Sequence, residues 1–326
     1  MRKSLLSVFL SVTFLSPGAH AADPATSWPN KPVTMIVASA AGGSADVLTR
    51  IVFNQLAKEM DASFVIDNRP GAGGGIGMAA VKRADPSGYT IGYGNVNTLG
   101  VNPSLFKKLP YDANADFDAV GHMFSVYNIL AVRPDHPAKD MASFIEYVRV
   151  NPGKFSYGAA GIGSSGHMAG ELLKSIGKLD AMFVPYQGDP QSLQDLMGGR
   201  IDFSLSNSSV VMPLVATGKL RALAITSLKR IPMYPDIQTF DEAGLKGYEN
   251  VSWGGVVVPK GTPAAVVAKL NEGLQKALKS EAVRESFAKL GATAGGGSPA
   301  DFRNLIAAEQ KKYKALIESA KIQKLD

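Results

Sequence analysis

The chain has 326 residues, of which 45% are hydrophobic, with a formal net charge of +6 and no cysteine. A chain of this length buries an ample core, and the length is typical of two domains. Without cysteine there are no disulfides, no cysteine nucleophile and no thiol for a lipid anchor. The basic residues are scattered and do not alternate with aromatic ones, so we predict no nucleic-acid partner.

The amino terminus has the order of a secretory signal peptide. A basic start, Arg2 and Lys3, precedes an apolar run at 5–15 and the small-residue pattern Ala19-His20-Ala21. A membrane-spanning helix needs about 20 apolar residues, roughly twice the length of this run. We predict a signal peptide at 1–21, cleaved after Ala21, and a free periplasmic protein that is not a lipoprotein.

From residue 33 onward, short apolar runs alternate with segments of helical periodicity. Strands are predicted at 33–38, 63–67 and 90–93, with helices at 47–60 and 76–83. The alternation restarts with strands at 129–132, 155–158, 182–184, 201–206 and 222–226, separated by helices at 141–150, 167–176, 191–197 and 210–216. A strand at 253–258 and helices at 266–278, 281–290 and 299–320 complete the chain. This order predicts an α/β protein with mainly parallel sheets.

The last segments lack the strands for a domain of their own, so we expect them to pack against the first part of the chain. The predicted lobes are residues 22–127 with 253–326, and residues 128–252. The chain then crosses between the lobes twice, near 126–128 and near 251–253. Two crossings form a hinge, and a central cleft between hinged lobes is a frequent place for a small-molecule site.

The first candidate site is the turn that follows the strand at 33–38. It consists of Ala40, Ala41, Gly42, Gly43 and Ser44 and opens a helix. Unpaired N–H groups and the positive end of the helix dipole favour an anion there. Taken alone, the same residues are equally typical of a plain tight turn.

Similar turns recur after other predicted strands, which favours a binding site. In open α/β sheets ligands bind at the carboxyl ends of strands, so these turns are expected to line one cleft. The candidate residues in them are Asn95, Asn97, Thr98, Gly161, Gly163, Ser164, Ser165, His167 and Asn207.

Cofactor and metal sites are not indicated. Gly161, Gly163 and Gly166 match a dinucleotide fingerprint, but Asp180 precedes the next strand instead of ending it, as ribose recognition requires. There is no phosphate-binding loop, and no histidine pair has metal-ligand spacing. We predict no cofactor and no metal.

Catalysis remains an alternative of a different class. Ser164 or Ser165 with His167 would form the nucleophile and base of a secreted hydrolase, although no Gly-x-Ser-x-Gly elbow occurs. Residues this close at a helix start are more typical of helix capping, so we predict no enzyme. The turns also lack an arginine clamp for a carboxylate. Recognition would then use backbone amides, hydroxyls, Asn side chains and water.

At these residues the chain resembles the Bug-type solute receptors of tripartite tricarboxylate transporters. The matching runs are AAGGSADVLTR (40–50), NRPGAGG (68–74), NPSLFKKLPYD (102–112), YGAAGIGSSGH (157–167), VPY (184–186), GKLRALA (218–224) and PKGTP (259–263). The resemblance implies a type II periplasmic binding protein fold and a carboxylate held by loop amides and ordered water. It also implies delivery to a membrane permease of one large and one small subunit, and it adds Tyr186 to the expected contacts.

Two departures from the family pattern concern the ligand. Ala38 and Ser39 stand where the family has a proline and an aromatic residue, and Ser206 replaces an acid next to Asn207. The first change favours room for an aromatic dicarboxylate, and the second disfavours an amino acid. We expect a monomer that binds a small di-, tri- or aromatic carboxylate. The sequence leaves open whether the receptor serves transport or reports to a membrane signalling protein.

Overall fold

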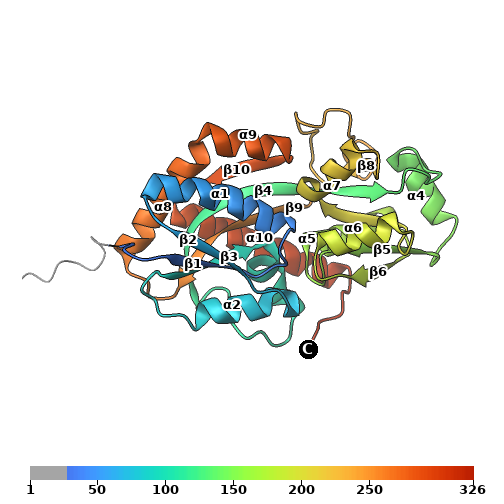
Figure 1. The fold of residues 1–326 in the computed structure, drawn as a ribbon. Coiled ribbons are helices and arrows are strands. Elements are labelled where there is room, and N and C mark those ends of the chain that lie inside the picture. Colours follow the sequence, from blue (N-terminus) through green and yellow to red (C-terminus); the bar gives the residue numbers. More distant parts are fainter. Residues whose placement is uncertain (1–27) are drawn as a thin grey trace, which may run out of the picture.

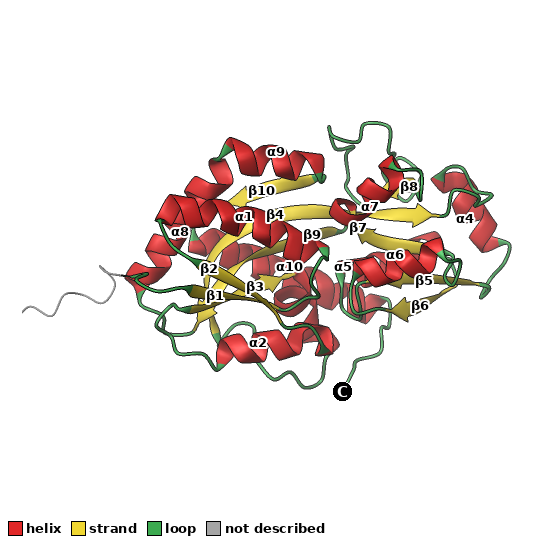
Figure 2. Cartoon of the chain, in the orientation of Figure 1, coloured by secondary structure: helices red, strands yellow, loops and turns green. Residues whose placement is uncertain are grey.

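A computed structural model describes residues 28–326, so the predicted signal peptide and its cleavage after Ala21 lie outside the described residues. The described chain folds into one continuous sheet with helices on both faces (Figures 1 and 2). Its strand order is β2-β1-β3-β9-β4-β7-β5-β6, and β10 and β8 also pair with β4. Within residues 28–326, no helix is both long and apolar enough to cross a membrane.

The strands are β1 Val33–Val37, β2 Phe64–Asn68, β3 Thr90–Asn95, β4 Phe117–Val132, β5 Phe155–Ala159, β6 Ala181–Pro185, β7 Phe203–Asn207, β8 Arg221–Ile225, β9 Val251–Pro259 and β10 Ala292–Gly296. The α-helices are α1 Ser44–Met60, α2 Gly75–Lys82, α3 Asn102–Leu105, α4 Met141–Arg149, α5 Ser165–Gly177, α6 Asp189–Met197, α7 Ser208–Ala216, α8 Ala264–Lys279, α9 Glu281–Lys289 and α10 Pro299–Ser319. A 3₁₀ turn, η1, covers Ala72–Gly74, and a π-helix, η2, covers Val96–Val101.

The long strand β4 belongs to both ends of the sheet. From Phe117 to Tyr127 it pairs with β9, and from Asn128 to Val132 it pairs with β7. We call the part with β1, β2, β3, β9 and β10 the first section and the part with β5 to β8 the second section. In Figure 1 the blue and orange-red ends of the chain lie together in the first section, and the green-yellow middle forms the second.

Each section has its own buried core. In the first, α1 and α8 pack on the sheet through residues such as Leu48, Leu56 and Leu270. In the second, α4 and α5 cover it through Phe144 and Leu173. The strands β1, β3 and β9 are buried on both faces along most of their length, as in sheets that helices cover from both sides. The boundaries predicted for the two lobes stay a prediction.

A group of buried polar side chains joins the two places where the chain passes between the sections. The Asn128 N–H donates to Thr226 Oγ1 over 3.0 Å, and the Thr226 hydroxyl donates to the Asn250 carbonyl over 2.6 Å. Asn128 Nδ2 also donates to Asn250 Oδ1 over 3.0 Å. These hydrogen bonds therefore hold the two connecting segments of the chain together.

The structure corrects four expectations. The sheet is not mainly parallel, because β4 pairs antiparallel with β7, β8, β9 and β10, and β3 pairs antiparallel with β9. Only the end of β4, 129–132, was predicted, whereas the strand begins at Phe117. The strand β10 was not predicted at all. Residues 95–98, expected as a loop, instead form the start of the π-helix Val96–Val101, whose first turn is closed by reciprocal hydrogen bonds between Asn95 and Thr98.

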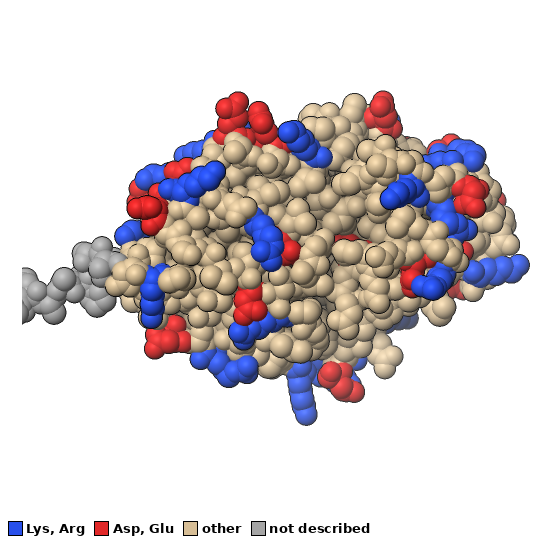
Figure 3. All heavy atoms as spheres, in the orientation of Figure 1, with Lys and Arg blue, Asp and Glu red and all other residues tan. Residues whose placement is uncertain are grey.

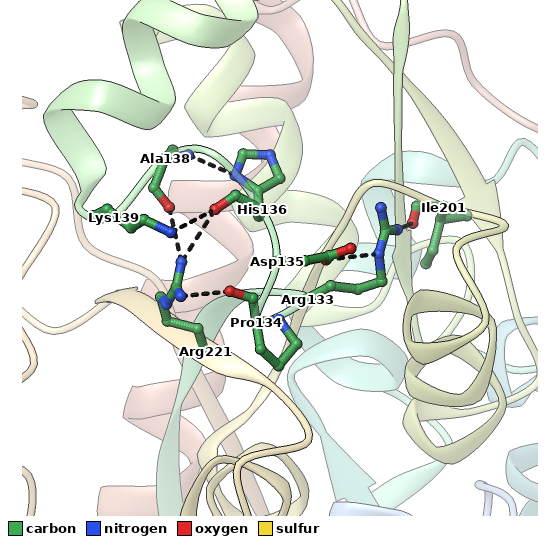
Figure 4. Close-up of polar contacts among 8 residues, drawn as sticks. All are labelled: Arg133, Pro134, Asp135, His136, Ala138, Lys139, Ile201 and Arg221. Atoms are coloured by element: carbon green, nitrogen blue, oxygen red, sulfur yellow. Dashed lines mark hydrogen bonds and ion pairs between the residues drawn. The ribbon is translucent and has the colours of Figure 1, made fainter.

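Arg221 stabilises the loop that follows β4 (Figure 4). Its guanidinium donates to the carbonyls of Pro134, His136 and Ala138 from the first residue of β8. A planar group with several donors suits these three loop carbonyls, of which that of His136 also accepts from Lys139 Nζ over 3.3 Å. The same loop is closed by the Ala138 N–H, which donates to His136 Nδ1 over 3.1 Å.

Replacing Arg221 with methionine is expected to lower the free energy of unfolding by about 2 kcal/mol, because partly buried carbonyls lose a charged donor. Urea unfolding measures the change. Arg221→Lys retains a charge and should recover part of the loss. A variant as stable as the wild type would show that water replaces the guanidinium without cost.

Candidate binding site between the two sections

Two adjoining cavities lie where the sections meet. The inner cavity has a volume of about 70 Å³, and the outer one has a volume of about 770 Å³. They share the lining residues Ser39, Asn97, Ala160 and Gln187. Both therefore belong to one recess, with a narrow inner end and a wide outer end.

Five helices begin at the inner cavity. Their N-cap residues, Gly43 of α1, Asn95 of η2, Ser164 of α5, Gly188 of α6 and Asn207 of α7, all line it. Helix N-termini carry free N–H groups and a partial positive charge. The inner cavity is therefore suited to an anion, and two of the five helices come from the first section and three from the second.

Full positive charges are absent from the recess. The described residues that line the two cavities include no Lys, Arg or His. On the face shown in Figure 3, basic and acidic side chains are interspersed over both sections and do not gather into one basic patch. Within residues 28–326, no three His, Asp or Glu side chains are grouped as a metal site. The positive partial charges at the inner cavity are those of backbone N–H groups at the helix starts.

The two sections touch each other around this cavity. The Ser209 hydroxyl on α7 donates to Ser44 Oγ on α1 over 2.7 Å. On the same side, the Ser208 hydroxyl donates to the Leu290 carbonyl over 3.2 Å. A Cβ on Gly188 would lie 3.3 Å from Ala40 Cβ across the recess. The sections are therefore closed on each other.

The structure brings most of the predicted site residues to this recess. Tyr186 and Gly161 line its outer cavity. The residues that line the inner cavity are Ala40, Gly43, Ser44, Asn95, Asn97, Ser164, Ser165 and Asn207. They come from four different turns, all at the carboxyl ends of strands, as expected for an open α/β sheet.

The other predicted residues, Ala41, Gly42, Thr98, Gly163 and His167, line neither cavity. Gly42 has a φ of +74° and its N–H donates to Asp46 Oδ2 over 2.8 Å. Thr98 closes the first turn of η2. In this arrangement the five residues shape the turns rather than face the ligand space.

His167 is a buried neutral side chain and not a catalytic base in this structure. Its Nδ1 accepts the Gly163 N–H over 3.2 Å, and its ring stacks on Phe183 at 4.2 Å. The Ser164 hydroxyl oxygen accepts the backbone N–H of His167, which makes Ser164 the cap of α5. No hydrogen bond joins the His167 ring to Ser164 or Ser165 within residues 28–326, so the pair that a hydrolase needs is not formed.

The burial of His167 predicts a loss of stability in acid. Desolvation lowers the pKa of His167 to about 4 from its ordinary value of 6.5. As the pH falls, His167 is protonated in the unfolded chain before it is protonated in the folded protein. The stability that the folded protein derives from a neutral His167 is therefore complete above pH 6.5 and is lost as the pH falls toward 4. The loss amounts to about 3 kcal/mol.

Asp189 acts in the opposite direction, because burial raises its pKa to about 6 and the folded protein then binds the proton first. The prediction is therefore tested as a difference. The unfolding free energy of the wild type minus that of His167→Asn should fall by about 3 kcal/mol between pH 7 and pH 4 in urea titrations. A difference that does not change with pH would contradict the burial of a neutral His167.

Several lining residues were missed in the sequence. Gln187 and Gly188, in the turn before α6, and Asp189, the first residue of α6, contribute to the inner cavity. Tyr93 and Phe124, stacked at 5.8 Å, form part of its floor. Ala160, Ala45 and Ser252 also line it. The turn before α6 lacks the run of small and hydroxyl residues that marked the other turns. Its usable signal was Pro190 in the first turn of α6, directly after Gly188 and Asp189.

Comparison with known proteins finds close relatives along the chain. Residues 48–322 match the family model described as tripartite tricarboxylate transporter family receptor. Rpa4515 of R. palustris, solved with adipate, is 34% identical with a TM-score of 0.89, and the match covers 91% of this chain and 100% of that one. The periplasmic binding protein BugD is 33% identical with a TM-score of 0.87 over 91% and 100%. MatC from Rhodopseudomonas palustris, solved with bound malate, is 32% identical with a TM-score of 0.84 over 89% and 100%.

A sheet shared by two helix-covered sections, with a recess between them lined by helix N-termini, defines an α/β periplasmic binding protein. Its class is therefore that of binding proteins and not of enzymes. The chain belongs to the tripartite tricarboxylate transporter receptor family, as the resemblance of its glycine turns implied. The predicted fold and family are confirmed.

Proposed function

We propose that this receptor encloses a small carboxylate at the inner cavity and passes it to the permease of a tripartite transporter, made of one large and one small membrane subunit. The observation that carries the proposal is the convergence of five helix N-termini on one enclosed space. Each helix terminus near an anion contributes about 0.3–1 kcal/mol. Together they compensate one carboxylate without a basic side chain.

The relatives support a carboxylate ligand. One was solved with adipate and another with malate. The outer cavity, about 770 Å³ in volume, has room for the rest of a di-, tri- or aromatic carboxylate beyond the group held inside. Small residues at Ala38 and Ser39 contribute to its wall, as the sequence suggested.

We further propose that capture is a hinge motion about Asn128, Thr226 and Asn250, and that the protein is a monomer. The hydrogen bonds among these residues keep the two passages of the chain together while the sections swing apart. Ser165, which lines the inner cavity, donates to Asn128 Oδ1 over 3.4 Å and so connects the site with this group. A signal peptide cleaved after Ala21 would place the receptor free in the periplasm.

A thermal-shift screen tests the ligand class. Succinate, malate, adipate, citrate and terephthalate are compared with glucose and with putrescine as controls. A true ligand at about a hundred times its Kd stabilises the fold by roughly 2.7 kcal/mol, which raises Tm by a few degrees. A shift with glucose or putrescine and with none of the carboxylates would overturn the proposal. Mass spectrometry of the exported protein tests the cleavage position.

A further inference from the structure

A buried acid lies in the cavity that is proposed to receive an anion. Asp189 is the first residue of α6, lines the inner cavity and is only 5% exposed. The Ser206 hydroxyl, on the neighbouring strand β7, offsets part of the rise in the pKa of Asp189 and also shares a hydrogen bond of 2.8 Å with the Ser204 hydroxyl. One hydroxyl does not satisfy a carboxylate, which has about four acceptor positions.

The Asp189 carboxylate disfavours a dianionic ligand that has no hydroxyl or ammonium substituent. A buried charge needs a partner of opposite sign or several donors, and the described residues that line the cavity provide no Lys or Arg. A second ligand carboxylate brought beside Asp189 would add repulsion between like charges in a poorly solvated space. A donor group on the ligand would instead satisfy Asp189.

A second acceptor, in a residue that lines the same cavity, has no partner within the described residues. Asn207 is the N-cap of α7, yet its side chain does not cap the helix, although capping is the usual task of asparagine there. Its Oδ1 is buried and has no hydrogen-bond partner in the described chain. Asn207 and Asp189 both line the inner cavity. Buried acceptors of this kind are nearly always paired, so an unpaired Asn207 Oδ1 beside the buried Asp189 indicates a donor that enters with the ligand.

We propose that Asp189 and Asn207 Oδ1 accept hydrogen bonds from a hydroxyl or ammonium substituent on the ligand. The preferred ligand is then a hydroxy- or amino-carboxylate rather than an unsubstituted di- or tricarboxylate. This inference rests on the proposed carboxylate function. It also revises the interpretation of Ser206, which stands in place of an acid and by itself disfavours an amino-acid ligand. In this chain Asp189, at the start of α6, supplies the acid instead.

Matched ligand sets test the proposal. Isothermal titration calorimetry at pH 7.5 compares propionate, lactate and alanine, then succinate, malate and aspartate, then glutarate, 2-hydroxyglutarate and glutamate. Within each set only the substituent at C2 changes, from hydrogen to hydroxyl to ammonium. In at least one set, the hydroxyl or ammonium member should bind at least tenfold more tightly than the unsubstituted acid. Which of the two binds better identifies the donor.

A variant at Asp189 tests whether this residue causes the preference for a hydroxy- or amino-carboxylate. In Asp189→Ala the ratio of affinities should fall to about twofold or less, and the unsubstituted acid should bind as well as before or better. Asp195→Asn is the matched control on the same helix. Its carboxylate accepts the Tyr186 hydroxyl over 2.9 Å and lines neither cavity, so the ratio should be unchanged.

Two results would overturn the inference and leave the proposed function intact. One is an unsubstituted acid that binds as tightly as its substituted partners. The other is an unsubstituted acid whose affinity rises tenfold at pH 5 in the wild type and not in Asp189→Asn, which would make a protonated Asp189 the donor. If no carboxylate binds in any set or in the thermal-shift screen, the proposed function itself fails.

Discussion

Replacing Gly188 with valine is expected to weaken carboxylate binding by roughly ten- to a hundredfold while the protein stays folded. A Cβ at Gly188 already lies 3.3 Å from Ala40 Cβ on the opposite section, and the backbone at Gly188 is extended, with a φ of −179°, so that any residue fits it locally. The two methyl groups of valine would hold the sections apart. Overpacking costs about 1–3 kcal/mol, and each 1.4 kcal/mol is a tenfold change in affinity.

Calorimetry with malate, succinate and adipate measures this effect, and urea unfolding checks the fold. Gly198→Val is the matched control, because Gly198 follows the other end of α6, is exposed, and would place its Cβ no closer than 3.4 Å to the Gln194 carbonyl. The control should bind as the wild type does. If Gly188→Val binds equally well, closure of the sections at this point is not part of capture.

Replacing Gly166 with alanine is expected to lower the free energy of unfolding by more than 3 kcal/mol. The added Cβ would lie 2.0 Å from the Leu205 carbonyl oxygen of β7 and 2.8 Å from Ala159 Cβ. Backbone cannot give way as a side chain does, so α5 would have to move off the sheet. Urea unfolding monitored by circular dichroism measures the loss.

Gly177→Ala, at the other end of α5, is the control for this change. Its Cβ would meet the flexible Leu179 side chain at 3.2 Å, and the expected effect is within about 1 kcal/mol. A Gly166→Ala variant as stable as Gly177→Ala would show that α5 adjusts freely. The expected result explains the fingerprint at Gly161, Gly163 and Gly166, since the third glycine here allows close packing of a helix on a strand.

Much of the fold could be predicted because local pattern and tertiary packing agree. The segment at 155–158 was predicted as a strand and is found at Phe155–Ala159, and the helix predicted at 299–320 is found at Pro299–Ser319. In α10 the Ser298 cap, the proline and Asp301 specify the helix start. Where local signals were complete, the bounds were nearly right.

The failures have a common physical cause. In β4 the pairing register shifts between Ala119 and Gly121 and again between His122 and Phe124, so the alternation of apolar and polar residues is interrupted. The strand β10 is rich in Ala and Gly, which have low strand propensity. It is a strand because it pairs with β4. Long-range pairing of this kind leaves little trace in a single segment.

The site was partly predictable for a similar reason. Turns rich in glycine and hydroxyl residues were recognised, and Gly43, Ser44, Ser164 and Ser165 lie at the inner cavity. Asp189 was missed because an acid at a helix start has an ordinary explanation in the helix dipole. Only its burial, with 5% of the residue exposed, distinguishes it.

The dipole-lined cavity also determines how this receptor responds to salt. Mobile ions weaken attraction between exposed full charges, with a screening length of about 8 Å at physiological ionic strength. Helix N-termini that face an enclosed space are reached by few such ions, and among the described residues no basic side chain lines the recess. We therefore expect the affinity of the proposed site for an anion to change little with ionic strength. Such a receptor would capture its ligand equally well in dilute and in saline surroundings.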